Sequence, residues 1–304
     1  MDQRSRTVSL TQRDRALIEK VYELRGCGIA HLHTLFWPHE SGISTCYRRI
    51  GRLVDAGYLA VQRLPSPTGI GSGKAFIVPG KVARRLIASS RGLPLSRVER
   101  TPDPVDSTLF AEHHLATVDV RLALELACAA DPRVQLLDFT PEIELRRHPI
   151  VIPESGTGNG KASQQRTILV PDGAFTLAYG GKQQRAWLEV DLATVAPRRM
   201  QTKLGGYLKR TGAEATIPVF FATTTETRAH QIARFAQDEA EHLSANPTIF
   251  FVTTLDCISP ETILVAPIWQ QPGVDRPVAI VPGSAPTRSV GTIYATASSP
   301  TRSE

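Results

Sequence analysis

The sequence predicts an α+β protein in two parts: a helical domain that ends in a hairpin, then a larger domain in which helices cover a sheet. Apolar residues recur at helical spacing three times within the first 56 residues, and a hairpin pattern follows. Beyond residue 108, one long helical pattern precedes strands that alternate with helices. The 304 residues suffice for two domains of ordinary size.

Three helices are expected in the first domain. Thr11 and Asp14 have the spacing of a capping box, with Asp in place of the usual Glu, and predict a helix over 12–24. A short second helix is expected over 29–36. Ser44 or Thr45 can begin a third helix that runs to about residue 56. The apolar face predicted for this third helix is Tyr47, Ile50, Leu53 and Val54.

Two strand-like runs over 58–64 and 75–78 enclose a segment rich in Pro, Gly and Ser. Three helices followed by a hairpin is the order of a winged helix-turn-helix domain, whose third helix enters the major groove of DNA. The other face of that helix carries Arg48, Arg49 and Arg52, and Lys74 lies beside the hairpin. These four residues are the predicted contacts to double-stranded DNA. A winged helix used for protein contacts is the alternative.

The charge is distributed unevenly along the chain. Residues 1–100 hold 17 Lys and Arg against 7 Asp and Glu, and the remainder holds 18 against 22. A basic first part joined to a mildly acidic second part indicates a polyanionic partner for the first.

Several other classes of protein are disfavoured. The four cysteines are scattered without a C-x-x-C pair, which argues against a zinc ribbon and fits a reducing compartment. Residues 1–10 are polar and do not resemble a signal peptide, and no apolar run approaches the roughly 18 residues of a membrane span. We therefore expect a cytoplasmic protein without membrane contact. There is no Gly-rich phosphate loop of an ATP-driven motor.

The predicted domains are residues 1–91 and 108–269, joined by a linker over 92–107. Residues 270–304 are expected to be mostly disordered, although 278–281 could add an edge strand. A polar loop is expected over 154–165. The second domain is predicted to contain helices over 109–130, 197–211 and 225–243, and strands over 134–139, 143–147, 168–177, 185–192, 217–223 and 248–254.

Acidic residues fall on two strands that are predicted to pair. Glu189 and Asp191 are two residues apart and therefore point to one face of their strand. If Asp172 on the preceding strand pairs beside them, three carboxylates converge. Such a cluster suits Mg²⁺ or Mn²⁺, and Lys203 on the following helix could reach it. Solvated carboxylates at strand ends are the alternative. His113 could orient a carboxylate or serve a structural role.

The sequence "PDG" followed by "EVD" on the next strand, after a helix, is similar to the PD-(D/E)xK nuclease superfamily. The resemblance implies an α/β nuclease-like fold in which Asp172 and Glu189 bind the metal. Asp191 stands where the superfamily has its lysine. Lys203 is the best substitute, so the resemblance implies a Mg²⁺-dependent endonuclease or a degenerate site.

A set of short motifs covers more of the chain. "LTQRDRALIEKVYELR", "RRIGRLVDAGYL", "HHLATVDVRLAL", "PDG", "LEVDLAT" and "KLGGYL" occur in the order typical of replication-relaxation proteins of bacterial plasmids and mobile elements, which the chain resembles. This resemblance implies a DNA-binding role in plasmid replication and DNA relaxation, with replication or mobilisation proteins as further partners. The competing hypotheses are an active endonuclease or nickase, and a winged-helix transcriptional regulator.

Overall fold

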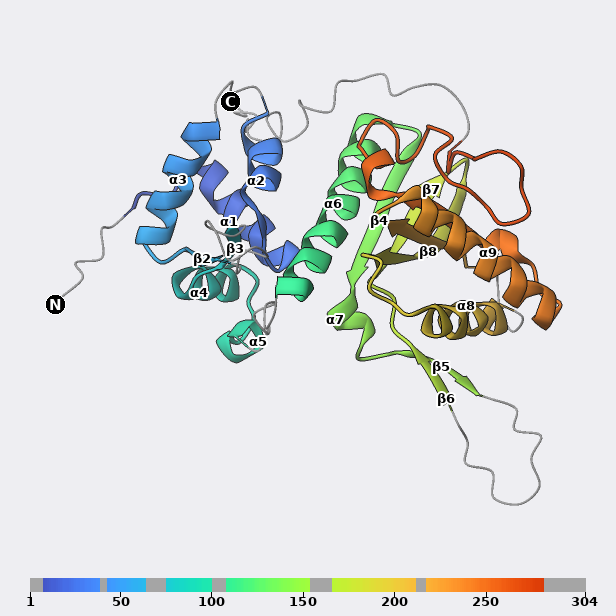
Figure 1. The fold of residues 1–304 in the computed structure, drawn as a ribbon. Helices are drawn as coiled ribbons and strands as arrows, with labels where there is room; N and C mark the ends of the chain where they lie inside the picture. Colours follow the sequence, from blue (N-terminus) through green and yellow to red (C-terminus); the bar gives the residue numbers. More distant parts are fainter. Residues whose placement is uncertain are drawn as a thin grey trace, which may run out of the picture. The chain divides into compact units, whose positions relative to one another are not determined.

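The computed structural model describes residues 8–38, 43–63, 75–99, 108–153, 166–211 and 217–281. The chain divides into two compact units, and the boundary lies between Asp119 and Val120. Both residues belong to helix α6 (Thr108–Ala130), drawn in green in Figure 1. The expected linker over 92–107 contains a short helix, α5 (Leu95–Glu99). Lys74 lies outside the described residues.

The first unit has the helices and the hairpin that the sequence predicts, in a mixed α+β arrangement. Its elements are α1 (Gln12–Leu24), β1 (Cys27–Gly28), α2 (Ile29–Phe36), α3 (Ile43–Asp55), β2 (Leu59–Arg63), β3 (Ala75–Pro79) and α4 (Lys81–Ser90). The three strands form an antiparallel sheet in the order β1-β3-β2. Strand β1 has two residues, too few to give a periodic signal.

Local sequence fixes both ends of α1. At the start, the predicted capping box is confirmed: the Asp14 N–H donates to Thr11 Oγ1 at 3.2 Å, and the Thr11 N–H donates to Asp14 Oδ2 at 2.7 Å. At the end, Arg25 adopts the left-handed conformation at φ 60° and Gly26 follows at φ 113°. A Cβ on Gly26 would lie 2.5 Å from the Phe76 ring, so this turn requires glycine.

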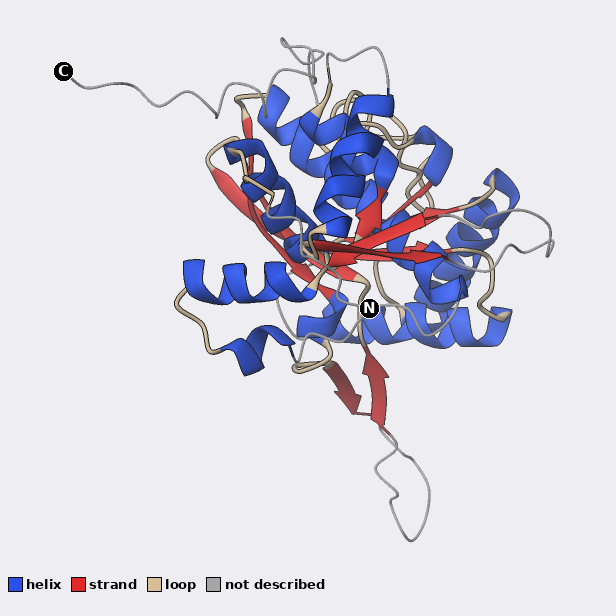
Figure 2. Cartoon of the chain, turned by 90° about the vertical axis from the view of Figure 1, so that its left-hand side faces the viewer, coloured by secondary structure: helices blue, strands red, loops and turns tan. Residues whose placement is uncertain are grey.

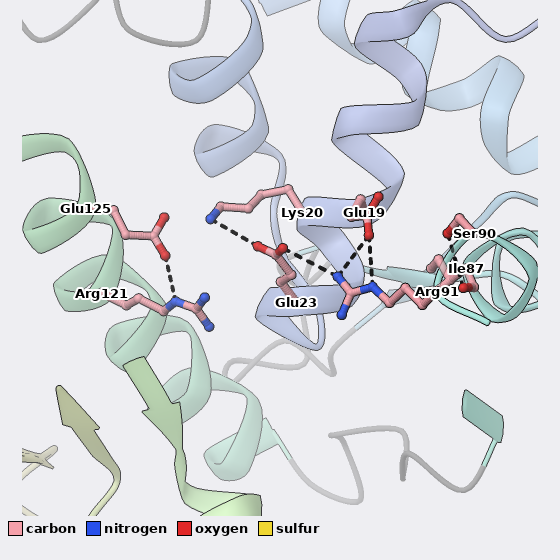
Figure 3. Close-up of polar contacts among 8 residues, drawn as sticks. All are labelled: Glu19, Lys20, Glu23, Ile87, Ser90, Arg91, Arg121 and Glu125. Atoms are coloured by element: carbon pink, nitrogen blue, oxygen red, sulfur yellow. Dashed lines mark hydrogen bonds and ion pairs between the residues drawn. The ribbon is translucent and has the colours of Figure 1, made fainter. Parts of the chain in front are cut away.

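Charged contacts tie α4 to α1. Arg91, which follows α4, binds Glu19 at 2.9 Å and Glu23 at 3.5 Å (Figure 3). Its guanidinium also lies 5.2 Å from the centre of the Tyr22 ring. Because these groups are partly exposed, the ion pairs contribute little individually.

Histidines bind the first half of α6 into the same unit. The ring of His114 lies edge-on to Phe76 with centroids 5.5 Å apart, and its Nε2 is 3.1 Å from the Gly26 carbonyl oxygen. His31 Nδ1 accepts from the Gly28 N–H at 3.1 Å, so its Nε2 carries the proton that faces Asp119 at 2.6 Å.

A five-stranded mixed sheet forms the centre of the second unit. Its order is β10-β9-β8-β7-β4, with β4 (Val134–Pro141), β7 (Gly173–Tyr179), β8 (Lys182–Asp191), β9 (Val219–Thr223) and β10 (Phe250–Thr254). Within this sheet, β7 pairs antiparallel with both β4 and β8. Strand β9 pairs parallel with both β8 and β10. The strands and helices therefore follow the predicted order of an α/β unit.

Helices α8 (Pro197–Thr211) and α9 (Glu226–Leu243) pack on one face of this sheet. A separate two-stranded ladder, β5 (Ile150–Pro153) and β6 (Arg166–Leu169), extends away from the sheet (Figures 1 and 2). Its inner side chains join the core beneath α8. That core includes Ile152, Leu169, Trp187, Leu204, Tyr207, Phe221, Ile232 and Phe250.

Two strand predictions in this unit are wrong. Residues 143–147 were expected as a strand, but α7 (Glu142–Leu145) forms there. The alternation of Ile143 and Leu145 covers too few residues to distinguish a strand, with its period of two, from a helix, with its period of 3.6. The acidic residues after Pro141 favour the start of a helix. The expected strand over 168–177 is divided into β6 and β7, which are separated by Val170, Pro171 and Asp172.

Residues 270–281 pack against the unit, contrary to the expected disorder. The backbone of Gln270 exchanges two hydrogen bonds of 2.9 Å with Val252 on β10, and Val278 pairs with Trp269. The Trp269 ring lies edge-on to Phe220 at 4.9 Å on the sheet face opposite α8. Residues 282–304 lie outside the described part. No helix in the described part is both long and apolar enough to cross a bilayer.

Candidate functional site

Helix α3 presents a continuous solvent-facing stripe. Its exposed residues recur every three or four positions, which places them on one side of the helix: Ile43, Ser44, Tyr47, Arg48, Gly51, Arg52 and Asp55. Tyr47 is 52% exposed, contrary to its predicted inward position, while Ile50 and Leu53 are buried as predicted. The described residues place no carboxylate in contact with Arg48 or Arg52. Both guanidinium groups are therefore available to an external anion.

Arg49 departs from the expectation that three arginines share this face. Its Nε donates to Asp14 Oδ1 at 2.7 Å, its Nη2 also contacts Asp14, and Nη2 donates to the Ser9 carbonyl at 3.1 Å. Asp14 is buried. Burial alone would raise the pKa of Asp14, but the hydrogen bonds from Arg49 and Thr11 outweigh it and lower that pKa. Arg49 therefore joins α3 to α1.

The second candidate site lies where β7 begins beside β8. The Asp172 N–H donates to the Leu188 carbonyl at 3.0 Å, and the Val190 N–H donates to Asp172 Oδ2 at 2.8 Å. Asp172 is thus held against the strand segment that contains Glu189. The two predicted carboxylates do come together, close enough for the charge of Asp172 to raise the pKa of Glu189.

Glu189 is a buried carboxylate with a partner on each oxygen. Lys203 Nζ contacts Oε2, and the Tyr207 hydroxyl donates to Oε1. Burial raises the pKa of Glu189, and the ammonium group of Lys203 opposes that rise by favouring the carboxylate. Burial also raises the pKa of Tyr207, which therefore remains a protonated donor. For Lys203, the charges of Glu189 and Asp172 outweigh burial and raise the pKa.

Two glycines allow α8 to lie close enough for these contacts. A Cβ on Gly206 would lie 2.9 Å from a methyl carbon of Leu169 on β6, and one on Gly205 would lie 3.1 Å from a Glu239 carboxylate oxygen on α9. Lys203 and Tyr207 flank this glycine pair and are four residues apart, so they share one helix face. The "KLGGYL" segment is therefore one structural unit built around Glu189.

Asp191 points to the same sheet face as Glu189, as its spacing predicts, but it has a different partner. Arg228 Nε on α9 donates to Asp191 Oδ2 at 2.6 Å, and Arg228 Nη2 donates to the Val195 carbonyl at 2.8 Å. Thr223 Oγ1 donates to the Asp191 carbonyl at 2.8 Å. Asp191 is therefore neutralised by a buried arginine.

The donor set does not fit a divalent ion in this arrangement. Among the described residues, no three His, Cys, Asp or Glu side chains are placed to hold a metal. Both Glu189 oxygens and one Asp172 oxygen already accept hydrogen bonds or an ion pair. The binding of Mg²⁺ or Mn²⁺ by Asp172 and Glu189 stays a prediction.

Sequence reasoning missed Tyr47, Tyr207 and Arg228. The four-residue spacing of Lys203 and Tyr207 was a usable signal for one of them, because it places both side chains on the same turn. Arg228 gave no signal, since its pairing with Asp191 depends on the packing of α9. His113 lies on the part of α6 that belongs to the first unit, where its carbonyl accepts from Thr117 Oγ1 at 3.0 Å.

Comparison with known protein families assigns this chain to one of them. The family model described as Replication-relaxation matches residues 18–219, which include both α3 and the Glu189 cluster. The chain belongs to the replication-relaxation family. No curated protein matches this family member. Among solved structures, the restriction endonuclease FokI is 12% identical with a TM-score of 0.22. That match covers 83% of this chain and 45% of the FokI chain, and a TM-score this low does not establish a common fold.

Proposed function

We propose that this protein binds double-stranded DNA and acts in the replication or relaxation of a plasmid or mobile element in the cytoplasm. The first unit is a winged helix-turn-helix domain that carries the DNA contacts, and the second is a nuclease-like domain. Replication or mobilisation proteins are the further partners. The observation that carries the proposal is the solvent-facing stripe of α3 with two exposed arginines, Arg48 and Arg52, that no described carboxylate contacts.

The order of elements supports this assignment of the first unit. Three helices, with a short strand before the second, lead into the β2–β3 hairpin, which is the order of a winged helix. In such domains the third helix enters the major groove, and α3 occupies that position. Its inward side is filled by Cys46, Ile50 and Leu53, which leaves the opposite side for a partner.

The chemistry of the stripe matches a DNA duplex. Arginine can pair bidentately with guanine or bind phosphate, and the Ser44 hydroxyl can donate to phosphate oxygens. Tyr47 presents a large exposed ring with a polar end between Ser44 and Arg48. Gly51 leaves the middle of the stripe open, because a Cβ there would meet no described atom within 4 Å.

The proposal is tested by measuring DNA affinity across a range of salt concentrations. The Arg48→Ala/Arg52→Ala variant should bind duplex DNA more weakly, and its log–log salt slope should fall by about 2 because each lost phosphate contact removes about 0.9. Lys182→Ala/Arg185→Ala is the matched control, since it removes two exposed cations from the turn end of β8. An unchanged slope in the α3 variant would contradict the proposal.

A metal-dependent endonuclease or nickase is the second candidate function. It is favoured by the meeting of Asp172, Glu189 and Lys203 at one point, since these are the residues that the PD-(D/E)xK resemblance assigns to cleavage. Supercoiled plasmid incubated with Mg²⁺ or Mn²⁺ tests it on an agarose gel. Nicked or linear product from the wild type, and none from Glu189→Ala, would support cleavage. Uncut but retarded plasmid in both lanes would support DNA binding alone.

A further inference from the structure

The surroundings of Glu189 already contain a positive charge where a metal ion would be expected. We propose that Lys203 is the resident cation of the second unit: its ammonium group neutralises the Asp172–Glu189 pair, and the closed cluster excludes divalent ions. This inference concerns the second unit only, does not depend on the DNA contacts proposed for α3, and opposes the metal-dependent cleavage named as the second candidate function.

The first argument is the occupancy of Glu189. Lys203 and Tyr207 use one carboxylate oxygen each, and the Glu189 side chain is only 2% exposed. Mg²⁺ requires near-octahedral oxygen coordination and usually keeps several of its waters. A divalent ion would have to displace both partners and bring water into a buried space.

The second argument is the lack of further carboxylate ligands nearby. Asp172 Oδ2 already accepts a hydrogen bond from the Val190 N–H, and Asp191 is paired with Arg228 at 2.6 Å. An ion that recruited Asp191 would leave Arg228, which is 8% exposed, buried without its carboxylate. The cost of an unpaired buried charge is several times larger than the value of a surface ion pair.

The third argument is charge balance. Three carboxylates, Asp172, Glu189 and Asp191, lie on this part of the sheet, and Lys203 interacts electrostatically with all three. Arg228 supplies the second positive charge. Two internal cations therefore compensate most of the acidic charge that would otherwise attract a metal.

The fourth argument is that α8 cannot easily withdraw its two side chains. Met200, Leu204, Tyr207 and Leu208 are each at most 2% exposed, and the Tyr207 ring packs on Trp187 with centroids 5.2 Å apart. Gly206 allows the helix to lie close to β6, since a Cβ there would lie 2.9 Å from a methyl carbon of Leu169.

Titration of the full-length protein with Mn²⁺, followed by calorimetry and by the electron paramagnetic resonance signal of free Mn²⁺, tests this proposal. The wild type should show no site up to millimolar Mn²⁺. Lys203→Met, which removes the charge at similar volume, should gain a site at least about tenfold tighter than any in the wild type. Adding Glu189→Gln to Lys203→Met should abolish that site. Lys209→Met on the exposed side of α8 is the matched control and should resemble the wild type.

Two results would overturn the proposal: a Mn²⁺ site in the wild type that Glu189→Gln removes, or no gained site in a Lys203→Met variant that remains folded by circular dichroism. The wild-type titration decides the question even if the variant does not fold. Because no DNA is present, this result is separate from the α3 experiment.

Discussion

Helices α3 and α8 both carry cations, but the two helices use them differently. On α3, Arg48 and Arg52 face solvent, while Arg49 is committed to the buried Asp14. On α8, Lys203 is committed to Glu189, while Arg198, Arg199 and Lys209 are exposed. The comparison teaches that a basic residue is available for a ligand only where packing has left it without a carboxylate. Neighbouring positions in the same motif can therefore have opposite roles.

The largest loss of stability is expected from Asp191→Ala, which leaves Arg228 buried in the second unit without its carboxylate partner. Breaking a buried pair by removing one partner costs about 3–5 kcal/mol, because the remaining charge is uncompensated. Urea denaturation monitored by circular dichroism measures the loss. Glu226→Ala, an exposed carboxylate in the first turn of α9, is the control and should change stability by much less. A loss below about 1 kcal/mol would show that Arg228 reaches water.

A smaller loss, about 3 kcal/mol, is expected from Arg49→Ala, because Arg49 is 22% exposed but its partner Asp14 is buried. The folded variant should keep the salt slope of DNA binding, in contrast to Arg48→Ala/Arg52→Ala. A reduced salt slope would show that Arg49 contacts DNA after all.

The same pair predicts an acid dependence. The pKa of Asp14 is lower in the folded state than in the unfolded chain, where it is about 3.9. The stabilisation is therefore present above that unfolded value and is lost as the pH falls through the lower, folded value. Asp14→Asn should flatten this part of the stability profile.

The smallest effects come from two glycines on the same two helices. Gly51→Ala should raise stability by about 1 kcal/mol, because the position is open and alanine is the better helix former. Gly206→Ala should stabilise less than Gly51→Ala, because its Cβ would lie 2.9 Å from a methyl carbon of the buried Leu169, whose side chain would have to shift. Thermal denaturation measures both changes. If Gly51→Ala also weakens DNA binding, the DNA backbone approaches α3 at that residue.

The sequence was most informative where the signals are local. The capping box of Thr11 and Asp14, and the proline that opens α8, define helix starts that the structure confirms. The meeting of Asp172 and Glu189 also followed from strand pairing. The ion pairs of Arg49 with Asp14 and of Asp191 with Arg228 could not be predicted. In each pair, the partner lies on a helix that is distant in sequence and is brought near only by packing. The packing of residues 270–281 was missed for a similar reason: Trp269 anchors that segment on the far face of the sheet.

The three tryptophans give each unit its own optical reporter. Trp37 is buried in the first unit at 2% exposure, while Trp187 and Trp269 are buried in the second at 5% and 1%. A Trp187→Phe/Trp269→Phe protein would emit from Trp37 alone, and Trp37→Phe would leave the emission of the second unit. Because a buried indole shifts its emission to longer wavelength when it becomes hydrated, these two proteins can separate the denaturation curves of the two units within the intact chain. Trp187, whose ring lies tilted against Tyr207 with centroids 5.2 Å apart, would also report directly on the loosening of the cluster around Glu189.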